Sequence, residues 1–425
     1  MLRILHTADW HLGQSFLGYE RDYEHDQFLT WLLQTLQERA TDVLLIAGDI
    51  FDSINPPATA QRRFFNFLAR AYAAAPKLQV VLIAGNHDAA ARLEAPARLL
   101  ESFNVTVVGT VERDPAGEIV HGKFLVPLRD PDGQVRAIAV AVPFLRPSDV
   151  PNVLEATDPH LDGVRELYKQ AVEEAEKLRD TQYPDATLIA LGHCHLRDAV
   201  PSPSERNLLM GGSAALHADT FPATLAYVAL GHLHKPQELA GGRIHYCGSP
   251  LPLSFSEKDY DHRVLEILID GAPPRVSPLP VPRTSVLMRI PETGPAPIAE
   301  VLELLEAAQF DASLPPAAQP FLEVRVLAEG PDTTRRQRIA AALEGKAVRL
   351  ASIKVEQPLR DLAGSGGVGG DGLILPLALE TLDPEEILLT VYRDRFRADP
   401  APEMLAAFRE ILQQHAYRPE PDVAA

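Results

Sequence analysis

The sequence has few cysteines and lacks both a long apolar run and a signal segment. Only Cys194 and Cys247 are cysteines among its 425 residues, too few for a disulfide framework and consistent with a reducing compartment. No stretch of about 18 uninterrupted apolar residues occurs, which argues against a membrane-spanning helix. The N-terminus begins directly with a strand-like pattern and has no signal-type apolar region or cleavage site. We therefore expect a cytoplasmic globular protein.

The chain also lacks an excess of positive charge and a phosphate-binding loop. Its 58 acidic and 40 basic residues give a net charge of −18, which argues against coating nucleic acid by bulk electrostatics. Clustered arginines or bound cations can still act locally. The glycine-rich stretch 363–372 has no Lys-Ser/Thr pair and no following helix, so we expect no bound nucleotide.

Apolar runs and helical patterns alternate in the first hundred residues. Residues 3–8, 42–47 and 79–84 are short apolar runs of buried-strand length, and residues 22–39 and 58–74 have helical spacing. Such alternation is typical of βαβ units in a sheet with parallel strands. Two hairpin patterns follow, one around the turn 130–133 and one around Gly241-Gly242, with an expected helix at 162–179 between them.

The predicted fold class is α/β, with a two-sheet αββα sandwich, a small α+β cap domain and a C-terminal helical pair. Prolines gather at 272–297 and 314–320, which suggests a domain junction. A β-α-β-α-β pattern follows it, and then the glycine-rich stretch, which resembles a flexible linker. The expected divisions are a main domain at 1–275, the cap at 282–358, the linker at 359–378 and the helical pair at 379–418.

Metal-capable side chains follow several of the expected strands. They lie in Asp9-Trp10-His11, in Gly48-Asp49, in Asn86-His87-Asp88 and in two Leu-Gly-His-x-His stretches at 191–195 and 230–234. Residues just beyond the carboxyl ends of strands in α/β sheets meet at one crevice. Five strand ends with such side chains therefore predict one site rather than five unrelated polar turns.

The spacing within these stretches also favours a shared site. In extended backbone, residues i and i+2 point to the same side, so Asp9 with His11, and His232 with His234, are expected to face one site together. Aspartate, histidine and asparagine without thiolate suit Mn²⁺, Fe or Zn²⁺. The strand ends offer more ligands than one ion needs, which favours a pair of ions about 3.5–4 Å apart with one carboxylate between them.

These motifs, DWHLG, GDIFD, GNHD and GHLH, resemble those of the calcineurin-like metallophosphoesterase superfamily. The wider stretches LHTADWHLG, ALGHLHKPQ and YCGSPLPLSFSE resemble its DNA double-strand-break repair nuclease family. The resemblance implies that His87 stabilises the transition state and helps to protonate the leaving oxygen, and that Asp52 and Asp88 orient histidines. It also implies one metal held by Asp9, His11 and His234, a second by Asn86, His193 and His232, and Asp49 bridging both.

The resemblance further implies an Mn²⁺-dependent DNA nuclease subunit that works with a coiled-coil ATPase in repair, recombination and replication. The expected activities are an ATP-dependent 3′→5′ exonuclease on double-stranded ends and an endonuclease on single strands and hairpins. The expected assembly is a homodimer of this chain within a heterotetramer. The cap would contact DNA, and the terminal helices would dock on the partner's coiled coil.

Several alternatives stay open. His195 is interpreted as a solvent-facing or supporting residue, and Cys194 as a packed thiol. The basic cluster 335–338 is as consistent with a solvated helix face as with phosphate contacts. A phosphodiesterase or phosphatase of small molecules would need neither the cap nor the tail. A scaffold with a vestigial site should have lost at least one ligand.

Overall fold

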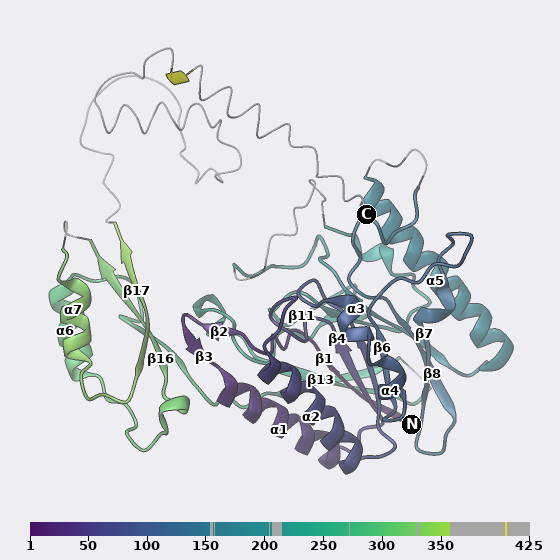
Figure 1. Cartoon of the computed structure of the whole chain (residues 1–425), viewed down its shortest axis with the longest axis horizontal. Coiled ribbons are helices and arrows are strands. Elements are labelled where there is room, and N and C mark those ends of the chain that lie inside the picture. Colours follow the sequence, from purple (N-terminus) through teal and green to yellow (C-terminus); the bar gives the residue numbers. More distant parts are fainter. Residues whose placement is uncertain are drawn as a thin grey trace. The chain divides into compact units, whose positions relative to one another are not determined.

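The computed structural model describes residues 1–153, 156, 158–203, 205, 215–271, 273–328, 330, 332–357 and 404–405 (Figure 1). The predicted linker at 359–378 lies outside the described residues, and so does the predicted helical pair at 379–418 apart from residues 404–405. In the described part of the chain, no helix combines the length and the apolar character needed to cross a membrane.

In the first of two large sheets, the parallel strands occupy the middle and one edge. Strands β1, β4, β5 and β6 run parallel; β13 pairs antiparallel with β1, and β14 pairs antiparallel with β13. The near-continuous apolar runs of the four parallel strands are typical of strands buried on both faces. In sheet order the strands are β14 (Arg275–Pro280), β13 (Arg263–Ile269), β1 (Leu2–Thr7), β4 (Val43–Ala47), β5 (Gln79–Ile83) and β6 (Val105–Val108).

The second sheet also has parallel strands at its centre, and a hairpin forms each edge. The pairs β7–β8 and β11–β12 are antiparallel, as the two hairpin patterns predict, while β8, β9, β10 and β12 run parallel. In sheet order the strands are β11 (Gln237–Leu239), β12 (Ile244–Tyr246), β10 (Tyr227–Gly231), β9 (Thr187–His193), β8 (Val135–Ala141) and β7 (Leu125–Arg129).

Helices cover the outer faces of the two sheets, so the predicted αββα sandwich is confirmed. One apolar core contains Ile4 of β1 together with Ala139 of β8 and Leu167 of the helix α5, whereas Leu5 and Leu44 pack against helices on the other face. Figure 1 shows α1 and α2 together on one side and α5 on another. The helices are α1 (Asp22–Glu38), α2 (Ala58–Ala74), α3 (Ala90–Glu94), α4 (Ala97–Glu101) and α5 (Pro159–Gln182).

The predicted α+β unit follows the sandwich and is confirmed as a three-stranded parallel sheet with two helices. Phe16 and Phe255 of the sandwich share an apolar cluster with Leu287 and Phe321 of this unit. Phe16 lies on a short hairpin of β2 (Ser15–Phe16) and β3 (Tyr19–Glu20). The elements of the unit are β15 (Leu287–Ile290), α6 (Ile298–Ala307), β16 (Phe321–Leu327), α7 (Arg335–Ala342) and β17 (Arg349–Glu356).

The carboxyl ends of the parallel strands from both sheets meet at one edge of the sandwich. A Cβ atom added at Gly231, the last residue of β10, would lie 2.0 Å from the carbonyl oxygen of Ala47, the last residue of β4. Only glycine allows so close an approach between two backbones. The loops that follow these strands are therefore neighbours, although they belong to different sheets.

A buried histidine in the core is expected to make the unfolding free energy depend on pH. His6 is fully buried, its Nδ1 lies 2.9 Å from the Tyr227 hydroxyl, and burial with nearby His245 lowers its pKa from 6.5 to about 3. Between these values the unfolded chain binds a proton that the folded chain does not, so stability falls as the pH falls from about 6.5. Each pH unit changes the unfolding free energy by about 1.4 kcal/mol.

The variant His6→Gln removes this titration. The free energy of unfolding is measured by urea denaturation at pH 6.5 and at pH 5. Between the two conditions it should fall by about 2 kcal/mol more in the wild type than in His6→Gln. Equal losses in the two proteins would mean that His6 binds its proton equally well in the folded and unfolded chains.

Candidate metal centre

Seven predicted ligands lie together at the edge where the strand ends meet. Asp9 and His11 follow β1, Asp49 follows β4, and Asn86 follows β5. His193 ends β9, while His232 and His234 follow β10. All are buried except Asn86, which is half-buried. Charged and polar groups at such depth are rare unless they are paired or hold a metal.

The backbone brings these side chains together through left-handed turns. The φ angles of Asp9, His11, Asp49 and His232 are 55°, 45°, 48° and 97°. Non-glycine residues seldom adopt this region, and such strain tends to occur at functional sites. The expectation of extended backbone is therefore wrong for both pairs. Strand β1 ends at Thr7 and the chain turns at Asp9 and His11, and β10 ends at Gly231 and the chain turns at His232.

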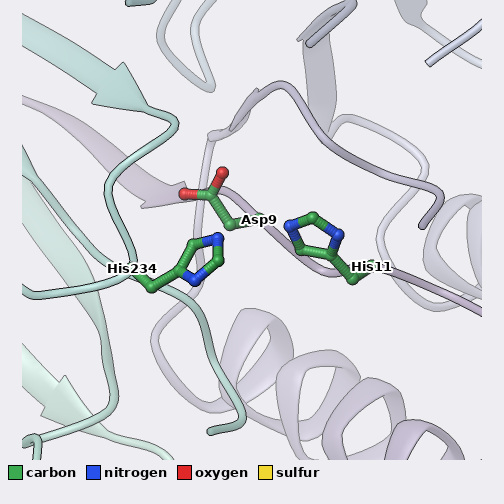
Figure 2. A group of neighbouring side chains, drawn as sticks. All are labelled: Asp9, His11 and His234. Atoms are coloured by element: carbon green, nitrogen blue, oxygen red, sulfur yellow. The ribbon is translucent and has the colours of Figure 1, made fainter. Parts of the chain in front are cut away.

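Asp9, His11 and His234 form the first group of candidate ligands. Their candidate ligand atoms all lie within 4.8 Å of one another. Figure 2 shows one ring nitrogen of each histidine on the side of the Asp9 carboxylate. Asp9 Oδ1 accepts a hydrogen bond from the His232 backbone N–H at 2.9 Å, but the buried Asp9 Oδ2 and His11 Nε2 find no hydrogen-bond partner among the described residues. Buried polar atoms without partners are costly, and a cation would satisfy both of these.

The second group lies around the side-chain oxygen of Asn86. His193 Nε2 is 2.9 Å from Asn86 Oδ1, and His232 Nδ1 is 3.1 Å from the same atom. His193 Nδ1 donates to the Ala47 carbonyl oxygen at 2.8 Å. This hydrogen bond orients the ring and leaves Nε2 as the nitrogen for a ligand, an arrangement usual for metal-binding histidines.

Asp49 lies between the two groups. Its Oδ2 is 3.4 Å from His193 Nε2 and 3.7 Å from His11 Nε2. Its Oδ1 accepts a hydrogen bond from the His87 backbone N–H at 2.8 Å. A carboxylate in contact with a histidine of each group is placed to bridge two cations.

The buried carboxylates and imidazoles of the cluster shift one another's pKa values. Burial raises the pKa of Asp9 to about 7. Burial would also raise the pKa of Asp49, but His193 and His11 outweigh it and hold that pKa below its usual value. Burial opposes protonation of His193, yet Asp49 raises its pKa to about 9. In the absence of cations, the buried carboxylates therefore share protons with the imidazoles.

Two glycines leave the space that this cluster occupies. A Cβ atom at Gly48 would lie 2.4 Å from His193 Nδ1, and one at Gly85 would lie 2.2 Å from Asp49 Oδ1. Gly48 also has a φ angle of 88°, which side-chain-bearing residues rarely adopt. Each glycine is required by the position of a ligand residue.

His87 and Asp52 lie at the mouth of the cluster. The His87 ring packs edge-on against His11, with centroids 4.7 Å apart, and its Nδ1 donates to the Asp52 carbonyl oxygen at 2.7 Å. Asp52 Oδ1 is 3.3 Å from His11 Nδ1, consistent with the predicted orienting role. Both side chains line a cavity of about 70 Å³ beside Asn86 and His234.

Asp88 has a different contact from the one predicted. Its buried carboxylate accepts hydrogen bonds from the backbone N–H groups of Ile50, Phe51 and Gly85, at 2.9 to 3.2 Å. Asp88 therefore fixes the loops that carry Asp49 and His87, and these bonds orient backbone rather than a histidine ring. Burial, with Asp49 nearby, raises its pKa to about 6.

His195 and Cys194 stay outside the ligand groups. The half-buried His195 ring lies 6.3 Å from the His232 ring, and the Leu216 backbone N–H donates to the His195 carbonyl oxygen. Cys194 is a free, partly buried thiol that packs against the core.

Two acidic residues that the motifs did not identify contact His234. Glu257 lies 2.9 Å from His234 Nδ1, and Glu205 accepts from the His234 backbone N–H at 2.7 Å. Neither residue follows a strand end. The only sequence signal was that Glu257 ends the stretch YCGSPLPLSFSE.

The donor set fits two divalent cations. It combines carboxylates, imidazoles and one amide oxygen. Asp9 Oδ2 and His11 Nε2 have no hydrogen-bond partner in the part of the chain that the structure describes, and a carboxylate lies between the groups. A two-sheet αββα sandwich with this cluster at its strand ends defines the class of metal-dependent phosphoesterases.

Comparison with protein families agrees with this class. A family model described as calcineurin-like phosphoesterase matches residues 2–236. A second model, described as type 5 capsule protein repressor C-terminal domain, matches residues 283–396. A solved structure titled as a dimetal phosphatase from Danio rerio aligns at a TM-score of 0.36 and 11% identity, over 66% of this chain and 96% of that chain.

Curated relatives are similar over much of the chain. The SbcD component of the nuclease SbcCD from Rhodobacter capsulatus is 42% identical over 364 residues, which cover 84% of this chain and 88% of the relative. Its counterpart in Escherichia coli K12 is 38% identical over 263 residues, which cover 60% of this chain and 62% of the relative. The chain therefore belongs to the calcineurin-like phosphoesterase family and, within it, to the SbcD nuclease subunits. Its family makes it a metal-dependent phosphodiesterase.

Proposed function

We propose that this chain is the DNA-cleaving subunit of an SbcCD-type complex and hydrolyses phosphodiester bonds at a two-metal site. The observation that carries the proposal is the position of Asp49 in contact with a histidine of each ligand group. Asp9, His11 and His234 would hold one ion, Asn86, His193 and His232 the other, and Asp49 both. The ions, which we propose to be Mn²⁺, would supply Lewis acidity and a hydroxide nucleophile at neutral pH.

His87 would act on the substrate directly. Because its Nδ1 donates to the Asp52 carbonyl oxygen, Nε2 is the ring nitrogen left for a phosphate oxygen. A proton on Nε2 would stabilise charge in the transition state and could then pass to the leaving oxygen. The Asp52 carboxylate would orient His11. Asp88 would hold the loops that carry Asp49 and His87 in place.

The proposed substrate and activities follow from the motif resemblance, and the proposed partner from the names of the relatives. We propose double-stranded DNA ends and hairpins as substrates, with 3′→5′ exonuclease and single-strand endonuclease activities in repair, recombination and replication. An SbcC-type coiled-coil ATPase would supply ATP hydrolysis and bind the predicted helical pair at 379–418. The active unit would be a cytoplasmic heterotetramer with a homodimer of this chain, and the unit at 282–358 would contact DNA.

The test is cleavage of an end-labelled linear duplex by the purified chain with and without the coiled-coil ATPase. We expect cleavage with Mn²⁺ in the complex, its loss with a chelator, and its return when Mn²⁺ is added back. A small diester, bis-p-nitrophenyl phosphate, is assayed in parallel. Hydrolysis of the small diester without any cleavage of DNA would overturn the nuclease proposal and favour a phosphodiesterase of small molecules.

A further inference from the structure

Glu257 is a buried carboxylate beside the first ligand group. Its exposed fraction is 0%, and it ends the short 3₁₀ turn η3 (Phe255–Glu257). Glutamate is almost never fully buried unless it is paired, so its surroundings indicate what it does.

Both carboxylate oxygens of Glu257 have partners from different segments. Oε1 lies 2.9 Å from His234 Nδ1 and accepts from the Ser202 hydroxyl at 3.1 Å. Oε2 accepts from the Leu253 backbone N–H at 2.7 Å. The loop before β10 and the chain before η3 thus fix the carboxylate from two sides, and it faces His234 in a single orientation.

The hydrogen bond determines which nitrogen of His234 is available to a cation. With Nδ1 donating to Glu257, the other ring nitrogen is left to accept, and Figure 2 shows one ring nitrogen on the side of Asp9. A carboxylate behind a metal-binding imidazole sets the tautomer and increases the basicity of the ligand. Glu205 fixes the backbone of the same residue through the His234 N–H.

We propose that Glu257 is a positioning residue that holds His234 in the tautomer and orientation needed to bind the ion shared with Asp9 and His11. This inference rests on the proposed two-metal site and names a supporting residue for it. It predicts an effect on one of the two ions, because Glu257 contacts His234 and that residue belongs to the first ligand group.

The test is a titration of the metal-free full chain with Mn²⁺, in which electron paramagnetic resonance measures the bound ion. Glutamine offers only one acceptor oxygen. In Glu257→Gln the side-chain NH₂ group therefore faces either His234 Nδ1 or the backbone N–H of Leu253. We expect Glu257→Gln to lower the affinity for one of the two ions about 10- to 100-fold and to leave the affinity for the other unchanged. Ser202→Ala is the companion variant, because it removes one of the groups that fix the Glu257 carboxylate and keeps the His234 contact. It should weaken binding of the same ion less than Glu257→Gln does and leave binding of the other ion unchanged.

A double-mutant cycle separates positioning from a structural role. In a His234→Ala background, Glu257→Gln should produce no further loss of Mn²⁺ affinity. Without metal, the single and double variants of the cycle should all unfold at the same temperature. If Glu257→Gln fails to fold, Glu257→Asp, which keeps the charge on a shorter side chain, takes its place in the cycle.

Three results would overturn the inference: wild-type affinity in the Glu257 variant, equal weakening of both ions, or additive losses in the cycle. Failure of the proposed function has a different signature, since the wild type would then bind two ions without cleaving DNA.

Discussion

Replacing His193 by alanine should reduce phosphodiester hydrolysis to background, whereas replacing His195 should leave most of the activity. His193 ends β9, its Nδ1 is fixed by the Ala47 carbonyl oxygen, and its Nε2 faces Asn86 and Asp49. Its loss would remove a proposed direct ligand, so the effect should exceed the roughly 10- to 100-fold loss in metal affinity typical of outer contacts. The measurement is the rate of DNA cleavage with Mn²⁺, together with bound Mn²⁺ per chain.

His195→Ala is the matched control for that variant. The two histidines lie in the same Gly-His-Cys-His stretch, and only His193 lies within reach of the ligand groups. Equal damage from the two substitutions would mean that His195 also serves the site and that the division between them is wrong.

Replacing His87 by alanine should lower the turnover number by about 10²- to 10⁴-fold, the usual range for a general acid or base. Both metal ions should remain bound, because the His87 side chain bonds to the Asp52 carbonyl oxygen and its backbone N–H, which contacts Asp49, is retained. Turnover and Mn²⁺ content are measured on the same preparation.

The outcome for His87 distinguishes a catalytic from a ligand role. Loss of one ion would make His87 a ligand, and a decrease of less than about tenfold would remove it from the proton-transfer step. A substrate with a leaving group of low pKa, such as p-nitrophenolate, should be less affected than DNA, because its departure needs no proton.

The strand ends of the site could be predicted because parallel strands place their carboxyl ends at one edge of a sheet. Apolar runs marked β1, β4 and β5, and polar residues directly after them marked the edge. The reason offered for the pairing of Asp9 and His11 was nevertheless wrong. Left-handed turns at both residues depend on hydrogen bonds from Asp9 N–H to Gly48 and from His11 N–H to Asp49, and spacing along one segment does not encode them.

The supporting carboxylates could not be found in this way. Glu257 lies 23 residues beyond His234 and contacts it through a 3₁₀ turn that has no periodic pattern. Asp88 stands in a recognisable motif, but two of its three partners are backbone N–H groups of another loop, and backbone donors leave no trace in residue identity. Local patterns reveal ligands at strand ends, whereas contacts between loops need the fold.

The most direct test of the account is a crystal of the chain grown with Mn²⁺ and measured at the manganese absorption edge. We expect two anomalous peaks about 3.5–4 Å apart, one beside Asp9, His11 and His234 and the other beside Asn86, His193 and His232, with Asp49 between them. A single peak, or two peaks that do not share Asp49, would contradict the two-metal site.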